Sequence, residues 1–161
     1  MQIDNLELTL MLRSAAAKFV DAAAADYVAR HWLRTHFRKA PRMNPLGEAV
    51  ADLENWREHE DAAFATPVDK GGVVIYDGNG LAPSLMLKTV HDDLARRAAA
   101  HGMAAAGLIN TAGIVTLGLW TEGLAERDLI GIAFFNGGAA CCVPHGGRRG
   151  LFGTTPTAYA I

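Results

Sequence analysis

The first quarter of the chain carries apolar residues at helical spacing from Asn5 to about Arg38, with no proline or glycine between them. The recurring apolar positions are Leu8, Met11, Leu12, Ala15, Phe19, Ala22 and Ala23. Asn5 is a suitable N-cap, so the pattern predicts one helix over residues 5–38. At 1.5 Å per residue, this helix would be about 50 Å long. Because that is long for a chain of this size, we expect it either to be broken or to dock on another chain.

Prolines and a glycine at residues 41–47 end this element, and the pattern then predicts a second helix over residues 46–64. Val50, Leu53 and Trp56 are expected to face inward. The charged positions are expected to form a solvated outer face, and they are Glu54, Arg57, Glu58, Glu60 and Asp61.

After residue 71 the pattern changes to short apolar runs separated by turns rich in glycine. Strands are predicted at 73–76, 103–109 and 129–135, helices at 82–100 and 116–126, and a last strand-like run at 157–161. Gly102 is suited to end the first of these helices. The alternation of strand and helix predicts an α/β fold, with N-terminal helices beside a mixed sheet that has crossover helices. We therefore divide the chain into a helical region, 1–70, and an α/β region, 71–161.

Composition and charge narrow the class of protein. Half of the 161 residues are hydrophobic, which is enough to bury one core. The formal net charge of −2 lacks the basic excess of a protein that binds phosphate backbones, so no nucleic-acid partner is expected. No run approaches the roughly 18 apolar residues of a membrane span, and the acidic start is unlike a signal peptide. We therefore expect a soluble, cytoplasmic chain with no membrane partner.

The cysteines and most of the histidines predict little chemistry. Adjacent Cys141 and Cys142 are expected to be buried thiols in a reducing compartment. His31 and His36 are five residues apart and do not share a helix face as metal ligands would, and no metal site is predicted. The histidines expected to be solvated or to cap helix ends are His59, His91 and His101.

Residues 144–150 differ, because they place His145, Arg148 and Arg149 on a glycine-rich loop between apolar runs. Guanidinium groups pair with carboxylates or phosphates, so this loop is either a binding loop or a solvated basic turn. Gly78-Asn79-Gly80 follows a strand like a dinucleotide-binding turn, but Pro83 stands where the third glycine of that motif would be.

Four stretches of the C-terminal half, between Gly72 and Ile161, resemble the type 2 malate/L-lactate dehydrogenase family, which includes sulfolactate dehydrogenases and reductases of cyclic imino acids. They are residues 77–82, 100–104, 129–132 with Asn136, and 143–159. Gly153-Thr154-Thr155-Pro156 is similar to the family's G-T-N-P signature, with Thr155 in place of Asn. The Pro-His-Gly and Leu-Phe-Gly details are most similar to the Δ1-piperideine-2-carboxylate/Δ1-pyrroline-2-carboxylate reductase branch.

The resemblance implies a sulfolactate-dehydrogenase-like fold that is not of the Rossmann type. It also implies a homodimeric enzyme that moves hydride between NADPH or NADH and a small carboxylic acid, a 2-oxo or 2-imino acid. Such a reaction needs an acid/base group, because hydride arriving at carbon requires a proton at oxygen or nitrogen. The implied residues are His36 as the acid/base, Arg38, His145, Thr154 and Thr155 near the substrate carboxylate, and Asn136 and Gly137 at the cofactor.

The sequence departs from the family in several places. Thr35-His36-Phe37 stands where the family has Ser-His-Gly, and Ala112 or Gly113 replaces the histidine of a second motif. Family members are longer, so we expect a truncated, N-terminal half, and they have two shorter helices where one is predicted here. Three hypotheses stay open. They are an active reductase completed by a dimer mate or a second chain, a catalytically degenerate binding or assembly subunit, and a cofactor-free acid/base enzyme on a related acid.

Overall fold

The computed structural model describes residues 4–38, 44–113 and 116–161, and it begins with three helices. These are α1 (Asn5–Ala16), α2 (Ala22–Phe37) and α3 (Pro45–Glu58). The predicted helix over residues 5–38 is therefore broken, which is one of the two alternatives expected from its length, since the chain leaves the helix after Ala16 and starts again at Ala22. Asp21 caps the new start, because its Oδ1 accepts hydrogen bonds from the backbone N–H groups of Ala23 and Ala24, both at 2.9 Å. Asp4, not Asn5, caps α1.

The helix α3 is shorter than predicted and faces the core differently. It ends at Glu58, and the charged side chains expected on its outer face are exposed. Val50 is half exposed, so its predicted inward orientation is wrong, while Leu53 and Trp56 do pack against the core. The buried polar position of this helix is Asp52, which is 7% exposed.

The first sheet has the strand order β1-β2-β3 and is mixed. Its strands are β1 (Val68–Lys70), which the sequence did not predict, β2 (Val73–Asp77) and β3 (Ala105–Ile109). Strands β1 and β2 are antiparallel, whereas β2 and β3 are parallel. The parallel pair is joined by the short 3₁₀ helix η1 (Pro83–Met86) and by α4 (Leu87–His101), which ends at Gly102 with a φ of 81°. The predicted α/β fold with a mixed sheet and a crossover helix is confirmed.

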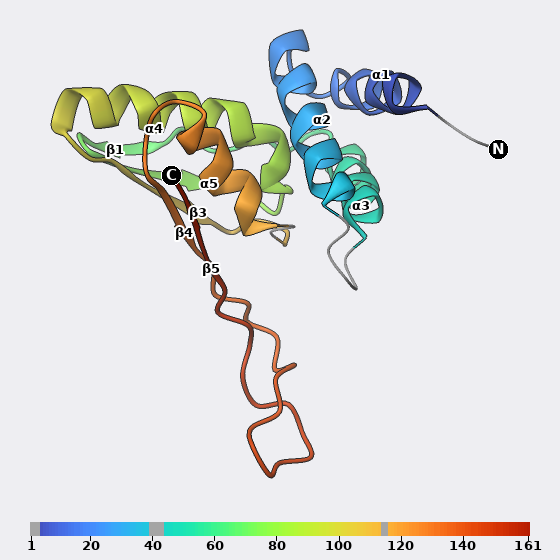
Figure 1. Ribbon diagram of the computed structural model, residues 1–161, viewed down its shortest axis with the longest axis vertical. Coiled ribbons are helices and arrows are strands. Elements are labelled where there is room, and N and C mark those ends of the chain that lie inside the picture. Colours follow the sequence, from blue (N-terminus) through green and yellow to red (C-terminus); the bar gives the residue numbers. More distant parts are fainter. Residues whose placement is uncertain (1–3, 39–43, 114–115) are drawn as a thin grey trace.

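The chain then forms a second, two-stranded sheet against a helix. Helix α5 (Leu117–Ala125) contacts both β4 (Gly131–Phe134) and β5 (Thr157–Ala160), which pair antiparallel. Ala133 and Ala158 face inward onto the core. The opposite face of this sheet exposes large apolar side chains, which are Ile132 at 50%, Phe134 at 73% and Tyr159 at 67%. The segment that joins the two strands runs out from the body of the molecule as a long loop (Figure 1).

One hydrophobic core joins the N-terminal helices to the α/β part. It contains Trp32 of α2, Val74 of β2, Leu87 of α4 and Leu119 of α5, each almost fully buried. Helix α2 lies at the centre of this arrangement, because it contacts α1, α3, α4 and α5. Within the described residues, no helix is both long and apolar enough to cross a membrane.

Candidate functional site

The loops that follow the parallel strands β2 and β3 hold each other at one edge of the sheet. The Asp77 carboxylate accepts hydrogen bonds from Asn110 Nδ2 at 2.9 Å and from the Asn79 backbone N–H at 3.0 Å. Asn79 and Asn110 both have a φ of 49°, a left-handed conformation that asparagine tolerates better than most residues. The backbone N–H of Gly80 donates to the Asn110 carbonyl at 2.7 Å. The carboxyl end of the sheet is therefore a fixed platform.

Helix α3 is anchored to this platform by two side chains. Asn55 bridges the loop after β2, because its Nδ2 donates to the Gly80 carbonyl at 3.1 Å and its Oδ1 accepts from the Ala82 N–H at 2.6 Å. Trp56 donates its indole N–H to the Ala82 carbonyl at 2.7 Å. These bonds satisfy loop groups that a buried position would otherwise leave unpaired. They also fix the distance between α3 and the sheet edge.

An open cavity of about 280 Å³ lies between α3 and this edge. Its lining residues are Glu48, Ala51, Asp52, Asn55, Ala82, Ala112 and Gly113. A volume of this size is close to that of small-ligand pockets. Its wall at 112–113 is where the resemblance to the dehydrogenase family implies a histidine, and this chain has Ala112 and Gly113 there. Carboxylate side chains of α3 thus line one side of the cavity, and small apolar residues line the other side.

Burial raises the pKa values of the two carboxyl groups that line the cavity, Asp52 and Glu48. Desolvation raises the pKa of Asp52 to about 6, the nearby Ser84 hydroxyl opposes that rise, and the charge of Glu48 adds to it. Desolvation also raises the pKa of Glu48. Asp52 Oδ2 and Ser84 Oγ nevertheless lack a hydrogen-bond partner of good geometry within the described chain. Asp52 therefore exchanges its proton near neutral pH and has one oxygen available.

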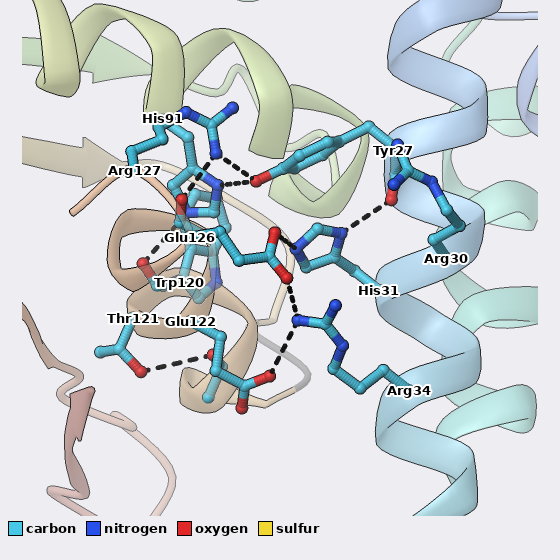
Figure 2. Close-up of polar contacts among 12 residues, drawn as sticks. Tyr27, Arg30, His31, Arg34, His91, Trp120, Thr121, Glu122, Glu126 and Arg127 are labelled. Carbon is cyan, nitrogen blue, oxygen red and sulfur yellow. Dashed lines mark hydrogen bonds and ion pairs between the residues drawn. The ribbon is translucent and has the colours of Figure 1, made fainter. Parts of the chain in front are cut away.

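A second group of polar residues lies between α2, α4 and α5, around the buried His91 (Figure 2). His91 Nε2 is 3.0 Å from the Trp120 carbonyl, which can only accept, so this nitrogen carries the proton. Its Nδ1 then accepts from the Tyr27 hydroxyl at 2.8 Å, and that hydroxyl accepts from Arg127 Nη1 at 2.8 Å. Arg127 is held in turn by Asp92 at 2.6 Å. Each group in this chain of hydrogen bonds thus donates to the next, from Arg127 through Tyr27 and His91 to the Trp120 carbonyl.

This network holds His91 neutral. Burial lowers the pKa of His91 to about 4, and the nearby Arg127 charge also disfavours protonation. The prediction of a solvated or capping role for His91 is therefore wrong, because the ring has no exposed surface. Since the His91 ring is fully buried, we assign the network a structural role that fixes α2 against α4 and α5.

His31 lies beside this network and joins it to a row of ion pairs. Its Nδ1–H donates to the Tyr27 carbonyl at 2.8 Å, and its Nε2 faces Glu126 at 3.8 Å. Burial lowers the pKa of His31. Arg34 pairs with Glu126 and lies 3.7 Å from Glu122 (Figure 2). The row continues toward the end of α2, where Arg38 pairs with the same Glu122.

The two predicted site residues on α2 lie in its last turn and at its C-cap. His36 is half-buried, and its ring packs edge-on against Phe37 at a centroid distance of 5.4 Å. Arg38 is about half exposed and is engaged by Glu122 from α5. A substrate carboxylate at Arg38 would therefore compete with a carboxylate of the protein. His36 carries no such partner among its described contacts.

The other predicted residues lie on the long loop between β4 and β5. Asn136 is exposed, and the neighbouring Gly137 N–H donates to the Thr154 carbonyl at 2.8 Å, so the two sides of the loop pair at its base. Thr155 is exposed as well. His145 is exposed on this loop, and Figure 1 shows the loop running out from the body of the molecule, away from α2. The structure therefore keeps the predicted residues in two groups, one on α2 and one on the loop.

The same loop corrects the prediction for the cysteines. Cys141 is exposed and Cys142 is half-buried, so they are not the buried thiols that the sequence suggested. Their sulfur atoms are 3.9 Å apart and both thiols are free. His59 and His101 are exposed at the ends of α3 and α4, as predicted.

Sequence reasoning missed Asp52 and Glu48, although a signal was present. Asp52 lies three residues after Ala49 and four before Trp56, on the apolar stripe of α3, and Glu48 lies one turn earlier on the same side. A carboxylate on an apolar stripe is unusual unless it is paired or functional. His91 had a similar signal, because Leu87 and Leu94 flank it at helical spacing.

Comparison with known proteins decides the family. The sequence model of the malate/L-lactate dehydrogenase family matches residues 8–161. The chain belongs to this family. The match begins within α1, so it extends the resemblance seen in the C-terminal half to the N-terminal helices. The break between α1 and α2 also gives the two shorter helices that the resemblance implies.

Proteins of known function or structure are similar to this chain over half of its length or more. A Δ1-pyrroline-2-carboxylate/Δ1-piperideine-2-carboxylate reductase from Pseudomonas putida is 33% identical over 89 residues, which are 55% of this chain and 26% of the reductase. The solved malate dehydrogenase from Pyrococcus horikoshii matches 99% of this chain with a TM-score of 0.74 and 17% identity, over 46% of its own length. The sulfolactate dehydrogenase from Methanocaldococcus jannaschii matches 94% with a TM-score of 0.70 and 18% identity, over 45% of its length.

These structural matches confirm the predicted sulfolactate-dehydrogenase-like fold. They also show that this chain spans about half the length of the solved relatives and about a quarter of the reductase.

Proposed function

We propose that this chain belongs to an oxidoreductase that reduces a 2-oxo or 2-imino acid with hydride from NADPH or NADH. The observation that carries the proposal is the continuous match of the dehydrogenase family to residues 8–161. The similarity to a reductase of cyclic imino acids favours a 2-imino acid among these substrates. A nicotinamide cofactor supplies the hydride when it is bound, and the protein must supply the proton.

We assign the proton to His36 and the substrate carboxylate to Arg38, His145, Thr154 and Thr155. His36 is half-buried in the last turn of α2, and a histidine side chain is the commonest general acid in enzymes. Arg38 can take a carboxylate by bidentate pairing once Glu122 releases it. For the four residues to act together with His36, the outer part of the loop must approach α2 of this chain or of another copy.

The predicted cofactor residues fit a nicotinamide cofactor in part. The exposed amide of Asn136 can donate and accept hydrogen bonds, as the polar edges of such a cofactor require. The Gly137 N–H already donates to Thr154 and is not available. A Cβ added at Gly153 would collide with the Gly137 carbonyl oxygen, so the close approach of these two glycines serves the pairing of the loop. Asn136 is therefore our candidate cofactor contact.

A calorimetric titration of NADPH and then NADH into the purified chain tests this proposal. We expect micromolar binding, followed by reductase activity with Δ1-piperideine-2-carboxylate or with 2-oxo acids. The His36→Ala variant should lose about 100-fold in turnover with unchanged cofactor affinity, because general acid catalysis contributes at least that much. His101→Ala, an exposed histidine at the end of α4, is the matched control. Failure of a folded chain to bind either cofactor would overturn the proposal for this chain.

The second candidate function is a catalytically degenerate binding or assembly subunit. It is favoured by Ala112 and Gly113, which line the cavity where the resemblance places a histidine. A chain of this kind folds and assembles, yet it binds no nicotinamide cofactor. The same titration therefore separates the two candidates.

We also propose that a second copy of this chain, or a complementing chain, covers the outer face of β4 and β5. Ile132, Phe134 and Tyr159 form an exposed apolar patch on this face, and such patches mark interfaces more often than free surface. Light scattering is expected to give at least a dimeric mass, and Phe134→Lys should shift it to the monomer. A monomeric mass for the unmodified chain at every concentration would contradict the homo-oligomer.

The two free thiols suit a reducing compartment, for which we propose the cytoplasm.

A further inference from the structure

The described residues leave the negative charge of the cavity between α3 and the sheet edge without a matching cation. Asp52 and Glu48 line it from α3, and the opposite wall consists of Ala82, Ala112 and Gly113. No lysine, arginine or histidine of the described residues forms an ion pair with either carboxylate. A buried carboxylate is costly unless a cation or hydrogen-bond donors compensate it.

The unpaired atoms are buried side-chain oxygens at the wall of the cavity or next to it. Asp52 is 7% exposed, and its Oδ2 has no hydrogen-bond partner in the described part of the chain. Glu48 Oε2 and Ser84 Oγ are likewise buried and unpaired there. A separate hollow of about 10 Å³, room for about one water, shares the lining residues Asp52 and Gly113 with the cavity and is also lined by Ser84. Asp52 and Glu48 therefore line the cavity with carboxylate oxygens that accept no hydrogen bond from the described residues.

We propose that this cavity binds a small cyclic organic cation, a protonated imine or amine, whose N–H group donates to Asp52 while Glu48 contributes a second negative charge. The volume of about 280 Å³ accommodates one five- or six-membered ring with its immediate surroundings. The alanines and the glycine of the far wall suit the CH₂ groups of such a ring. A neutral ring or a simple anion would leave the carboxylate charge unmatched.

This inference deepens the proposed function and rests on it for the identity of the substrate. Of the two substrate classes proposed above, only the 2-imino acid carries a protonatable nitrogen in its ring. The site therefore selects the cyclic iminium form over a 2-oxo acid. Asp52 and Glu48 then act as binding residues for the substrate nitrogen, from a helix that carries none of the predicted catalytic residues.

Titration of the purified chain with piperidinium chloride tests the site without any cofactor or turnover. Nuclear magnetic resonance or calorimetry should give a dissociation constant of about 1 mM or tighter, as expected for a ligand of few atoms. Tetrahydropyran, the uncharged ring of the same size, should bind at least tenfold more weakly. Equal affinity for the two rings would overturn the inference.

Substitutions in α3 test whether Asp52 and Glu48 are the residues that bind piperidinium. Asp52→Asn should weaken piperidinium binding at least tenfold and Glu48→Gln a few-fold. The matched control is Glu54→Gln on the exposed face of the same helix, which should change nothing. Binding that survives Asp52→Asn, or magnesium chloride that displaces piperidinium at lower concentration, would overturn the assignment to an organic cation.

The outcomes also separate this inference from the proposed function. Piperidinium binding without NADPH or NADH binding would support the cation site and contradict the reductase. Cofactor binding and reduction of 2-oxo acids without piperidinium binding would support the reductase and contradict the cation site.

Discussion

Replacing Gly123 by alanine is expected to destabilise the protein by about 3 to 4 kcal/mol. In an exposed helix, this change would normally add up to about 1 kcal/mol of stability, because alanine is the better helix former. Here a Cβ at residue 123 would lie well inside contact distance of the His91 ring and of the Tyr27 hydroxyl. Both are buried and hydrogen-bonded to each other, so neither can move away without breaking that bond.

The expected loss combines two costs. Overpacking a well-packed core costs about 1 to 3 kcal/mol, and breaking the bond between Tyr27 and His91 leaves buried polar groups unpaired at about 1 to 3 kcal/mol. The gain in helix propensity offsets a part of this sum. Urea unfolding measures the difference in the free energy of unfolding between the variant and the unmodified protein. The slope of this free energy against urea concentration should be the same for both.

A matched glycine on the same helix serves as the control. At Gly118, an added Cβ would lie 2.9 Å from the end of the Glu122 side chain, which is flexible and can shift, and its next neighbours, at 3.6 and 3.7 Å, are at ordinary contact distance. Gly118→Ala should therefore be close to neutral. Equal stabilities of the Gly123→Ala and Gly118→Ala variants would contradict the close packing of α5 against the buried His91.

Most elements of the fold could be predicted from the sequence, because they depend on local periodicity. The strand at β2, the helix α4 with its end at Gly102, and the strands β4 and β5 all lie within a few residues of their predicted ranges. The position of the break between α1 and α2 could not be predicted in this way. Residues 17–21 contain no proline or glycine, and the new helix depends on Asp21, whose capping role is visible only once the chain has turned.

The site was harder to predict, because its polar residues find their partners far along the chain. Tyr27 and His91 are 64 residues apart, and Arg38 meets Glu122 across 84 residues. Periodicity can show that Asp52 or His91 falls on a buried face. It cannot show whether the partner there is a tyrosine, a carbonyl or an open cavity, and this difference separates a structural histidine from a candidate binding carboxylate.

The second large effect is expected at Asp52, where replacement by asparagine should stabilise the protein at neutral pH by about 3 kcal/mol. Burial raises the pKa of Asp52 from an ordinary value of 3.8 to about 6, so the folded protein holds this proton more tightly than the unfolded chain does. The stability that this group contributes is fully present below pH 3.8 and is lost as the pH rises through about 6. Asparagine cannot ionise and therefore avoids the loss.

The difference between the two proteins should consequently depend on pH. At pH 4 the Asp52→Asn variant and the unmodified chain should be similarly stable, and the advantage of the variant should grow to its full size above pH 7. The groups that face Asp52 are Glu48 from α3 and the Ser84 hydroxyl from η1. Only Glu48 among them titrates, and removal of the neighbouring charge makes its own ionisation easier. Thermal or urea unfolding between pH 4 and pH 8 measures the effect.

Glu54→Gln, on the exposed face of α3, should show no such pH dependence and serves as the control. A loss of stability in Asp52→Asn at pH 8 would mean that a cation of the protein already neutralises the carboxylate, and the cavity would then have no free charge to offer a ligand. A gain in stability together with loss of piperidinium binding would mean that no cation of the protein neutralises the carboxylate and that its charge is available to a ligand. The chain then retains a destabilising carboxylate because its charge is used for binding, which is the trade-off expected at a functional site.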